Sequence, residues 1–63
     1  MSQNIMIESA ISLYQRELRK SKTPEQDDLI FDIYSRRIDR CKGTKREKDH
    51  AIRYMAMLKE HKK

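Results

Sequence analysis

Two helix-start signals divide this chain into three segments of similar length. Thr23 is followed by Pro24 and Gln26, which places a threonine cap, a first-turn proline and a capping-box side chain in register. Thr44-Lys45-Arg46-Glu47 forms a second capping box. Because a helix should begin at each signal, the sequence predicts three short helices, at about 3–21, 24–42 and 45–60.

Apolar residues recur at three- and four-residue spacings in all three segments, as one face of a helix requires. The single glycine, Gly43, follows the second segment, where a residue in the left-handed conformation can close a helix. The apolar arcs of the last two segments are wider than one neighbouring helix can cover. We therefore predict an all-α fold, either a three-helix bundle or a helical hairpin, completed by homodimerisation.

The length of the chain limits the size of its core, and its composition indicates where it is located. With 63 residues we expect one small helical domain over 1–63, with a C-terminal tail that frays from about 60. A single cysteine excludes an intramolecular disulfide framework, so pairing of two copies is the stabiliser that remains. Because no apolar run approaches the roughly 20 residues of a membrane span and no secretory leader is evident, we expect a cytoplasmic protein.

Positive charge is concentrated in the second half of the chain. Residues 1–35 contain four Lys or Arg against six Asp or Glu, whereas residues 36–63 contain eleven against four. The cations of 36–42 fall in the last turns of the second segment, where they complement the helix dipole. That half of the basic block therefore needs no functional explanation.

Three further cations depart from the helix-end rule. Lys45, Arg46 and Lys48 lie in the first turns of the third segment, where the dipole disfavours positive charge. A helix start with free amides and cations suits a phosphate or a carboxylate, although Glu47 and Asp49 can neutralise the same turn locally. The residues expected to contact an acidic partner or a phosphate are Arg36, Arg40, Lys45, Arg46, Lys48 and Arg53.

Nothing in the spacing of the reactive side chains predicts catalysis. Cys41 falls on the apolar side of the second segment, where a free cysteine behaves as a small buried hydrophobe. His50 and His61 lie on a charged helix, and with Cys41 they supply too few converging ligands for zinc. The only glycine is a predicted helix stop and not part of a phosphate loop. We expect a binding protein with no catalytic, cofactor or metal site.

Two kinds of partner are compatible with this sequence. An apolar surface on the last two helices, flanked by arginines, favours an acidic protein. Direct nucleic-acid binding through 36–53 is the alternative, but the connection between the last two segments does not match a helix-turn-helix turn. The residues expected to form the apolar interface are Leu29, Ile33, Tyr54, Met55 and Met57.

In size and style the chain resembles small helical regulators encoded by bacteriophages and mobile elements. Such regulators often act by binding a host transcription or DNA-processing protein, and the resemblance implies a similar role here. The similarity is one of form and rests on no particular residues. We therefore expect a dimeric regulator that binds and alters another, DNA-associated protein.

Overall fold

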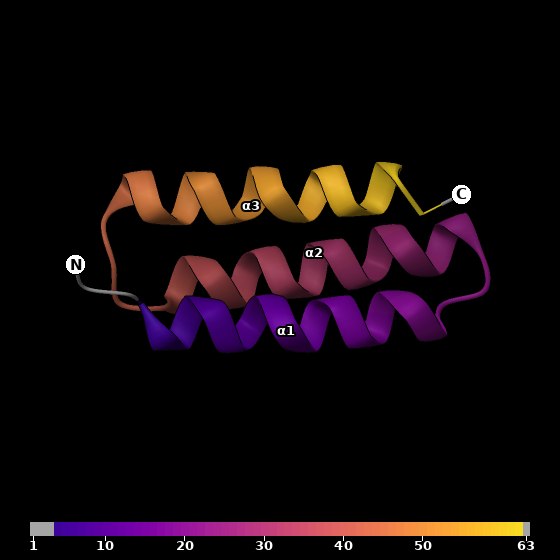
Figure 1. Ribbon diagram of the computed structural model, residues 1–63, viewed down its shortest axis with the longest axis horizontal. Helices are drawn as coiled ribbons and strands as arrows, with labels where there is room; N and C mark the ends of the chain where they lie inside the picture. The colour runs from indigo at the N-terminus through magenta and orange to yellow at the C-terminus, as the bar shows by residue number, and fades with distance from the viewer. Residues whose placement is uncertain (1–3, 63) are drawn as a thin grey trace.

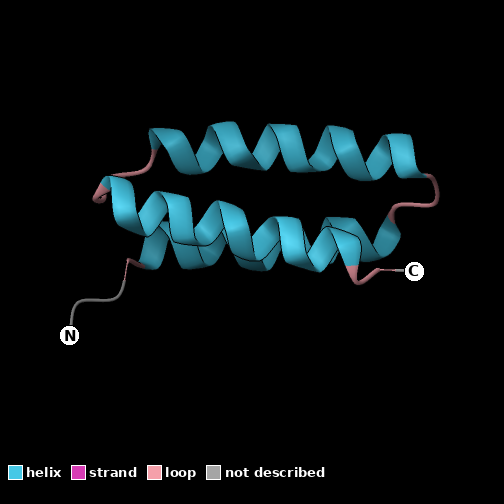
Figure 2. Cartoon of the chain, turned by 90° about the horizontal axis from the view of Figure 1, so that it is seen from above, coloured by secondary structure: helices cyan, strands magenta, loops and turns pink. Residues whose placement is uncertain are grey.

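Three helices, each antiparallel to the one before it, make up the described part of the chain. The structure is a computed structural model that describes residues 4–62. Its helices are α1 (Ile5–Lys20), α2 (Pro24–Arg40) and α3 (Lys45–Glu60). Each helix packs against both others (Figure 1), and α2 lies beside the overlapping pair of α1 and α3 (Figure 2). This arrangement confirms the predicted all-α fold and, of the two arrangements considered, the three-helix bundle.

Both predicted threonine caps are present. Thr23 Oγ1 accepts a hydrogen bond from Gln26 N at 3.1 Å, and Thr44 Oγ1 accepts one from Glu47 N at 3.2 Å. Glu47 Oε1 also accepts from Thr44 N at 2.9 Å, which completes the second capping box. At the first signal the Gln26 side chain accepts instead from Lys22 N, at 2.8 Å. The caps therefore satisfy amide groups that a helix start leaves without partners.

The end of α2 differs from the prediction. The helix stops at Arg40, and Cys41 is already extended, with φ −69° and ψ 152°. The Cys41 N–H donates to Ile38 O at 3.0 Å. Gly43 has φ +158°, so it does not supply the left-handed helix cap expected there. The helix ends earlier because Cys41 is drawn into the core, where only 7% of its surface stays exposed.

Gly43 is needed for a different reason, because the start of α1 lies against the α2–α3 turn. The Asn4 side-chain amide donates to Lys42 O, while Asn4 Oδ1 caps α1. A Cβ on Gly43 would lie 2.6 Å from Asn4 Nδ2 and 3.3 Å from Glu47 Oε1. The absence of a side chain at Gly43 therefore lets the N-cap of α1 approach the α2–α3 turn at one end of the bundle.

The core is built from all three helices and the residue that follows α2. Among the described residues no charged side chain is buried. Partly buried side chains from each helix complete the packing around the buried set. The buried residues are Ile7, Ala10, Tyr14, Leu18, Ile38, Cys41, Ala51 and Met55.

Tyr14 lies where the three helices meet and has no exposed surface. Its hydroxyl donates to Met55 O in α3 at 2.9 Å. Its ring packs edge to face against Phe31 and Tyr34 of α2, with centroid separations of 6.4 and 5.9 Å. Burial, with a smaller contribution from the charge of Asp27, raises the pKa of Tyr14 to about 12. One side chain of α1 thus joins both other helices.

We predict that the bundle loses stability at high pH through Tyr14. An unfolded tyrosine ionises near pH 10, whereas the pKa of folded Tyr14 is about 12. The stabilisation is complete below pH 10 and is lost as the pH rises through 12, a change of about 2–3 kcal/mol. Urea unfolding from pH 8 to pH 12 should show a steeper decline for the wild type than for Tyr14→Phe. Equal declines would contradict the burial of the hydroxyl.

We predict that Gly43→Ala lowers the free energy of unfolding by about 1–3 kcal/mol, because the added Cβ meets the Asn4 amide. Asn4→Ala alone removes a helix cap and should cost about 1 kcal/mol. The double variant should cost less than the two single changes together, because truncating Asn4 relieves the clash. Additive costs in thermal unfolding would show that the two residues do not touch.

Candidate functional site

Large apolar side chains remain exposed after the bundle has formed. Two lie on α2 and two on α3, and the others belong to α1. Isolated exposed apolar residues are ordinary, but several aligned on one helix face indicate an interaction surface. Those at least 38% exposed are Ile5, Met6, Leu13, Leu29, Ile33, Tyr54 and Met57.

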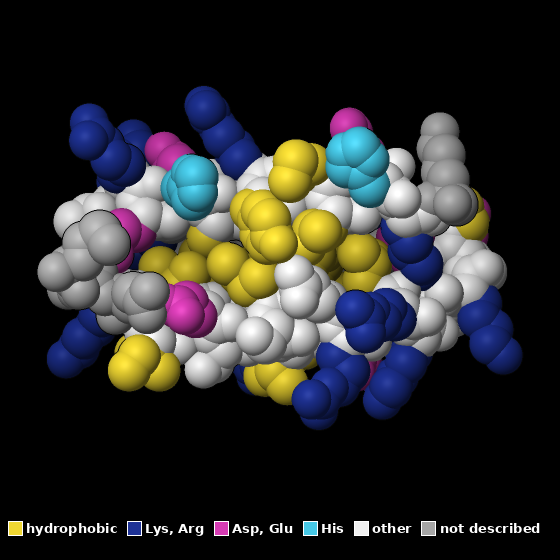
Figure 3. All heavy atoms as spheres, in the orientation of Figure 1, with side chains coloured by type: hydrophobic (Ala, Val, Ile, Leu, Met, Phe, Trp, Pro, Cys, Tyr) yellow, Lys and Arg dark blue, Asp and Glu magenta, His cyan; other side chains and the backbone are white. Residues whose placement is uncertain are grey.

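A groove, here called the α1/α3 groove, runs along the seam between these two helices. Figure 3 shows hydrophobic side chains following the seam, with two histidines above it. Gln15 Nε2 donates to Tyr54 Oη across the seam at 3.3 Å. One hollow of about 390 Å³ is lined by Asn4, Ile7, Glu8, Ile11, Glu47, His50, Ala51 and Tyr54. A second, of about 280 Å³, is lined by Gln15, Leu18, Arg19, Leu58, His61 and Lys62.

The two ends of the α1/α3 groove carry opposite charges. Glu8 and Glu47 line the end where both helices start, and Arg19 and Lys62 line the end where both helices stop. This polarity follows from topology, because α1 and α3 run in the same direction and each has a glutamate in its first turn and a basic residue in its last turn (Figure 1). A docked segment therefore meets an apolar floor with a defined electrostatic direction.

A basic hollow adjoins the groove on the outer side of α3. It has a volume of about 400 Å³ and is lined by Lys45, Arg46, Asp49, His50 and Arg53. His50 lines both this hollow and the α1/α3 groove, so the two are neighbours. Three of the six predicted anion contacts, Lys45, Arg46 and Arg53, are thus brought together. Asp49 lies among them and reduces the net positive charge.

The other predicted anion contacts do not line this hollow. Lys48 is half-buried, and its Nζ donates to Asp39 O in the last turn of α2 at 2.8 Å. It thereby complements the negative end of the α2 dipole, which accounts for a cation near the start of α3. Arg36 lies on the outside of α2, 3.4 Å from Asp32, and Arg40 is exposed on the same helix.

The five residues of the predicted apolar interface lie in three different places. Met55 has no exposed surface and packs in the core against Tyr14. Tyr54 and Met57 are exposed on α3, 38% and 46% respectively, and Tyr54 lines the groove. Leu29 and Ile33 are exposed on α2, which contributes nothing to the groove lining.

The contribution of α1 to the groove was not anticipated from the sequence. Ile11 is half-buried in the groove lining, and Gln15 bonds to Tyr54 across it. The available signal was weak: a polar Gln15 directly beside the buried Tyr14 on an otherwise apolar arc. A polar residue in this position can be recognised as the edge of the core only when the position of the neighbouring helix is known.

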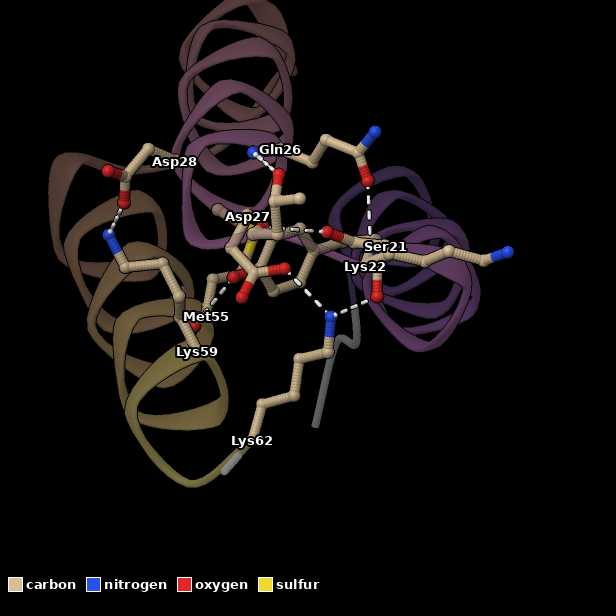
Figure 4. Close-up of polar contacts among 10 residues, drawn as sticks. Ser21, Lys22, Gln26, Asp27, Asp28, Met55, Lys59 and Lys62 are labelled. Atoms are coloured by element: carbon tan, nitrogen blue, oxygen red, sulfur yellow. Dashed lines mark hydrogen bonds and ion pairs between the residues drawn. The ribbon is translucent and has the colours of Figure 1, made fainter.

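Polar contacts tie the C-terminal end of the described chain to the first turns of α2 and to the α1–α2 turn (Figure 4). Lys62 Nζ donates to Asp27 Oδ1 and to Ser21 O, each at 2.8 Å. Lys59 Nζ pairs with Asp28 at 2.8 Å. The hydrogen bond from Lys62 is the main reason that the pKa of Asp27 is lowered. Because these charged groups pair with one another, the contacts hold the helix ends together and leave none of these charges free for a ligand. The fraying predicted from about residue 60 stays a prediction.

No helix in residues 4–62 has the length and apolar character needed to cross a membrane. Within the same residues, no three His, Cys, Asp or Glu side chains are grouped so that they could hold a metal ion. In comparisons with known proteins, no protein family, curated protein or solved structure matches the chain.

We predict that the cations at the start of α3 affect stability differently. Lys48→Met should lower the free energy of unfolding by about 0.5–1 kcal/mol, because it removes a charge from the C-terminal end of α2. Lys45→Met and Arg46→Met should leave stability unchanged or raise it by about 0.3 kcal/mol, because they relieve an unfavourable dipole contact. Urea unfolding at low salt measures all three, and equal effects would contradict the separation of Lys48 from the other two.

Proposed function

We propose that this chain is a non-enzymatic regulator that binds another protein through the α1/α3 groove. The observation that carries the proposal is the apolar seam itself, where hydrophobic side chains remain exposed along two shallow hollows between α1 and α3 (Figure 3). A groove between two helices accepts the apolar face of a third helix, which here would complete a four-helix arrangement.

The charges beside the groove favour an acidic partner helix. Arg46 and Arg53 line the basic hollow that adjoins the groove at His50. An amphipathic helix seated in the groove, with carboxylates along the flank above α3, would meet both arginines at once. Such contacts at the rim raise the association rate and select the partner more than they add affinity.

The biological role belongs to the same proposal. The resemblance in form to phage and mobile-element regulators supports a transcription or DNA-processing protein as the target, in the cytoplasm. Homodimerisation also remains a proposal. The bundle itself buries Ile38 and Met55, which reduces the apolar surface that a second copy needs to cover.

We predict that Tyr54→Glu reduces partner binding at least tenfold, because Tyr54 is 38% exposed and lines the groove, so that the substitution places a charge in the apolar lining. The tagged full chain would first capture its target from the native host, and the purified target would then be titrated by calorimetry. Ile5→Glu is the matched control, because Ile5 is 75% exposed and lines neither hollow of the groove. Equal affinities for the wild type and Tyr54→Glu would contradict docking in the groove.

Direct nucleic-acid binding is the second candidate, and the basic hollow favours it. Lys45, Arg46 and Arg53 gather around one hollow and can contact successive phosphates. We predict for this alternative that a DNA or RNA fragment binds with an affinity that falls steeply as salt rises, and that Lys45→Glu with Arg46→Glu abolishes binding. No retardation of either nucleic acid at low salt would contradict this candidate and leave the groove proposal unaffected.

A further inference from the structure

The outer face of α2 carries a stripe of residues that lies outside the core shared by the three helices. Leu29 and Ile33 are 60% and 51% exposed, and both lie outside the buried cluster. With them the stripe includes Gln26, Arg36 and Arg40, at alternating spacings of three and four residues. That alternation is the seam pattern of a helix that pairs lengthwise with another helix.

The charges along α2 determine which direction of pairing is favourable. Its first half is acidic and its second half basic, but Asp27 and Asp28 are engaged by Lys62 and Lys59. Glu25 therefore remains as an acidic group at the start, and Arg36 lies toward the other end. A second α2 laid parallel would bring like charges together, whereas an antiparallel copy would bring Glu25 beside the partner's arginine.

We propose that two copies of this chain associate through these outer faces, with their α2 helices antiparallel. Position 31 is the midpoint between residues 29 and 33, and it is also the midpoint between residues 26 and 36. A two-fold axis level with Phe31 therefore sets Leu29 against the partner's Ile33 and Gln26 against the partner's Arg36. This self-complementary pairing is what a two-fold dimer requires.

The acidic residue closest to the axis is already compensated. Asp32 approaches its own symmetry mate, but Arg36 of the same helix lies 3.4 Å away and offsets the repulsion. The apolar centre is small, with two half-exposed side chains from each copy, so the interface belongs to the weak class. We expect a dissociation constant on the order of 0.1 mM at low salt.

This proposal rests on the homodimerisation proposed above, for which it names the interface, and it does not depend on binding in the groove. The linings of the two groove hollows come from α1, α3 and their adjoining residues, whereas the stripe lies on α2. Both surfaces can be occupied at the same time. Failure of one assignment therefore leaves the other standing.

Sedimentation equilibrium of the full chain, from about 10 µM to 1 mM, tests the dimer across the expected dissociation constant. The mass should rise from 7.6 kDa toward twice that value as the concentration increases. Leu29→Glu should weaken association at least tenfold, while the groove variant Tyr54→Glu should associate like the wild type. Ile33→Gln provides a milder second variant, and circular dichroism verifies that each variant keeps its helices.

The direction of pairing is tested by exchanging charges. In chains that also carry Asp32→Asn, so that residue 32 needs no compensation by Arg36, Glu25→Arg and Arg36→Glu should each weaken association several-fold. The chain carrying both exchanges should recover association, because the cross-pair is rebuilt with its charges reversed. A mass of 7.6 kDa at every concentration would overturn the dimer. Association unaffected by Leu29→Glu would overturn the interface, and a double variant weaker than either single variant would overturn the antiparallel arrangement.

Discussion

The hydroxyl of Tyr14 is the polar group on which the arrangement of the bundle depends. A fully buried phenol without a partner would be costly, and Met55 O supplies that partner from the middle of α3. The ring of the same residue packs against two aromatic side chains of α2. The hydrogen bond therefore sets the register between α1 and α3, and the aromatic contacts hold α2 behind them.

The surface features follow from that register. Because α1 and α3 run parallel and level with each other, their acidic starts share one end of the groove and their basic ends share the other. Because the Phe31 and Tyr34 side of α2 faces Tyr14, Leu29 and Ile33 point away from the core. One internal contact thus leaves two separate apolar surfaces, one on the seam and one on the back of α2.

Local signals in the sequence were sufficient to predict the elements of this fold. Thr23 and Thr44 cap the second and third helices where expected, and Cys41 is buried as a small hydrophobe. The early end of α2 accompanies the burial of Cys41, and the role of Gly43 depends on Asn4, nearly forty residues away. The same is true of the candidate sites. The spacing of Lys48 and Met55 resembles that of their exposed neighbours. Lys48 is engaged because the end of α2 brings Asp39 O to it, and Met55 is buried because the helices pack around Tyr14.

The most direct test of this account is a set of NMR distance measurements on the Tyr14 ring in the wild-type chain. The account predicts cross-helix nuclear Overhauser effects from the Tyr14 ring to Phe31 and Tyr34 of α2 and to Met55 of α3 in the same sample. It also predicts a hydroxyl proton that exchanges slowly with solvent. A Tyr14 ring with contacts only within α1, and a hydroxyl in free exchange, would contradict the shared register and the groove that depends on it.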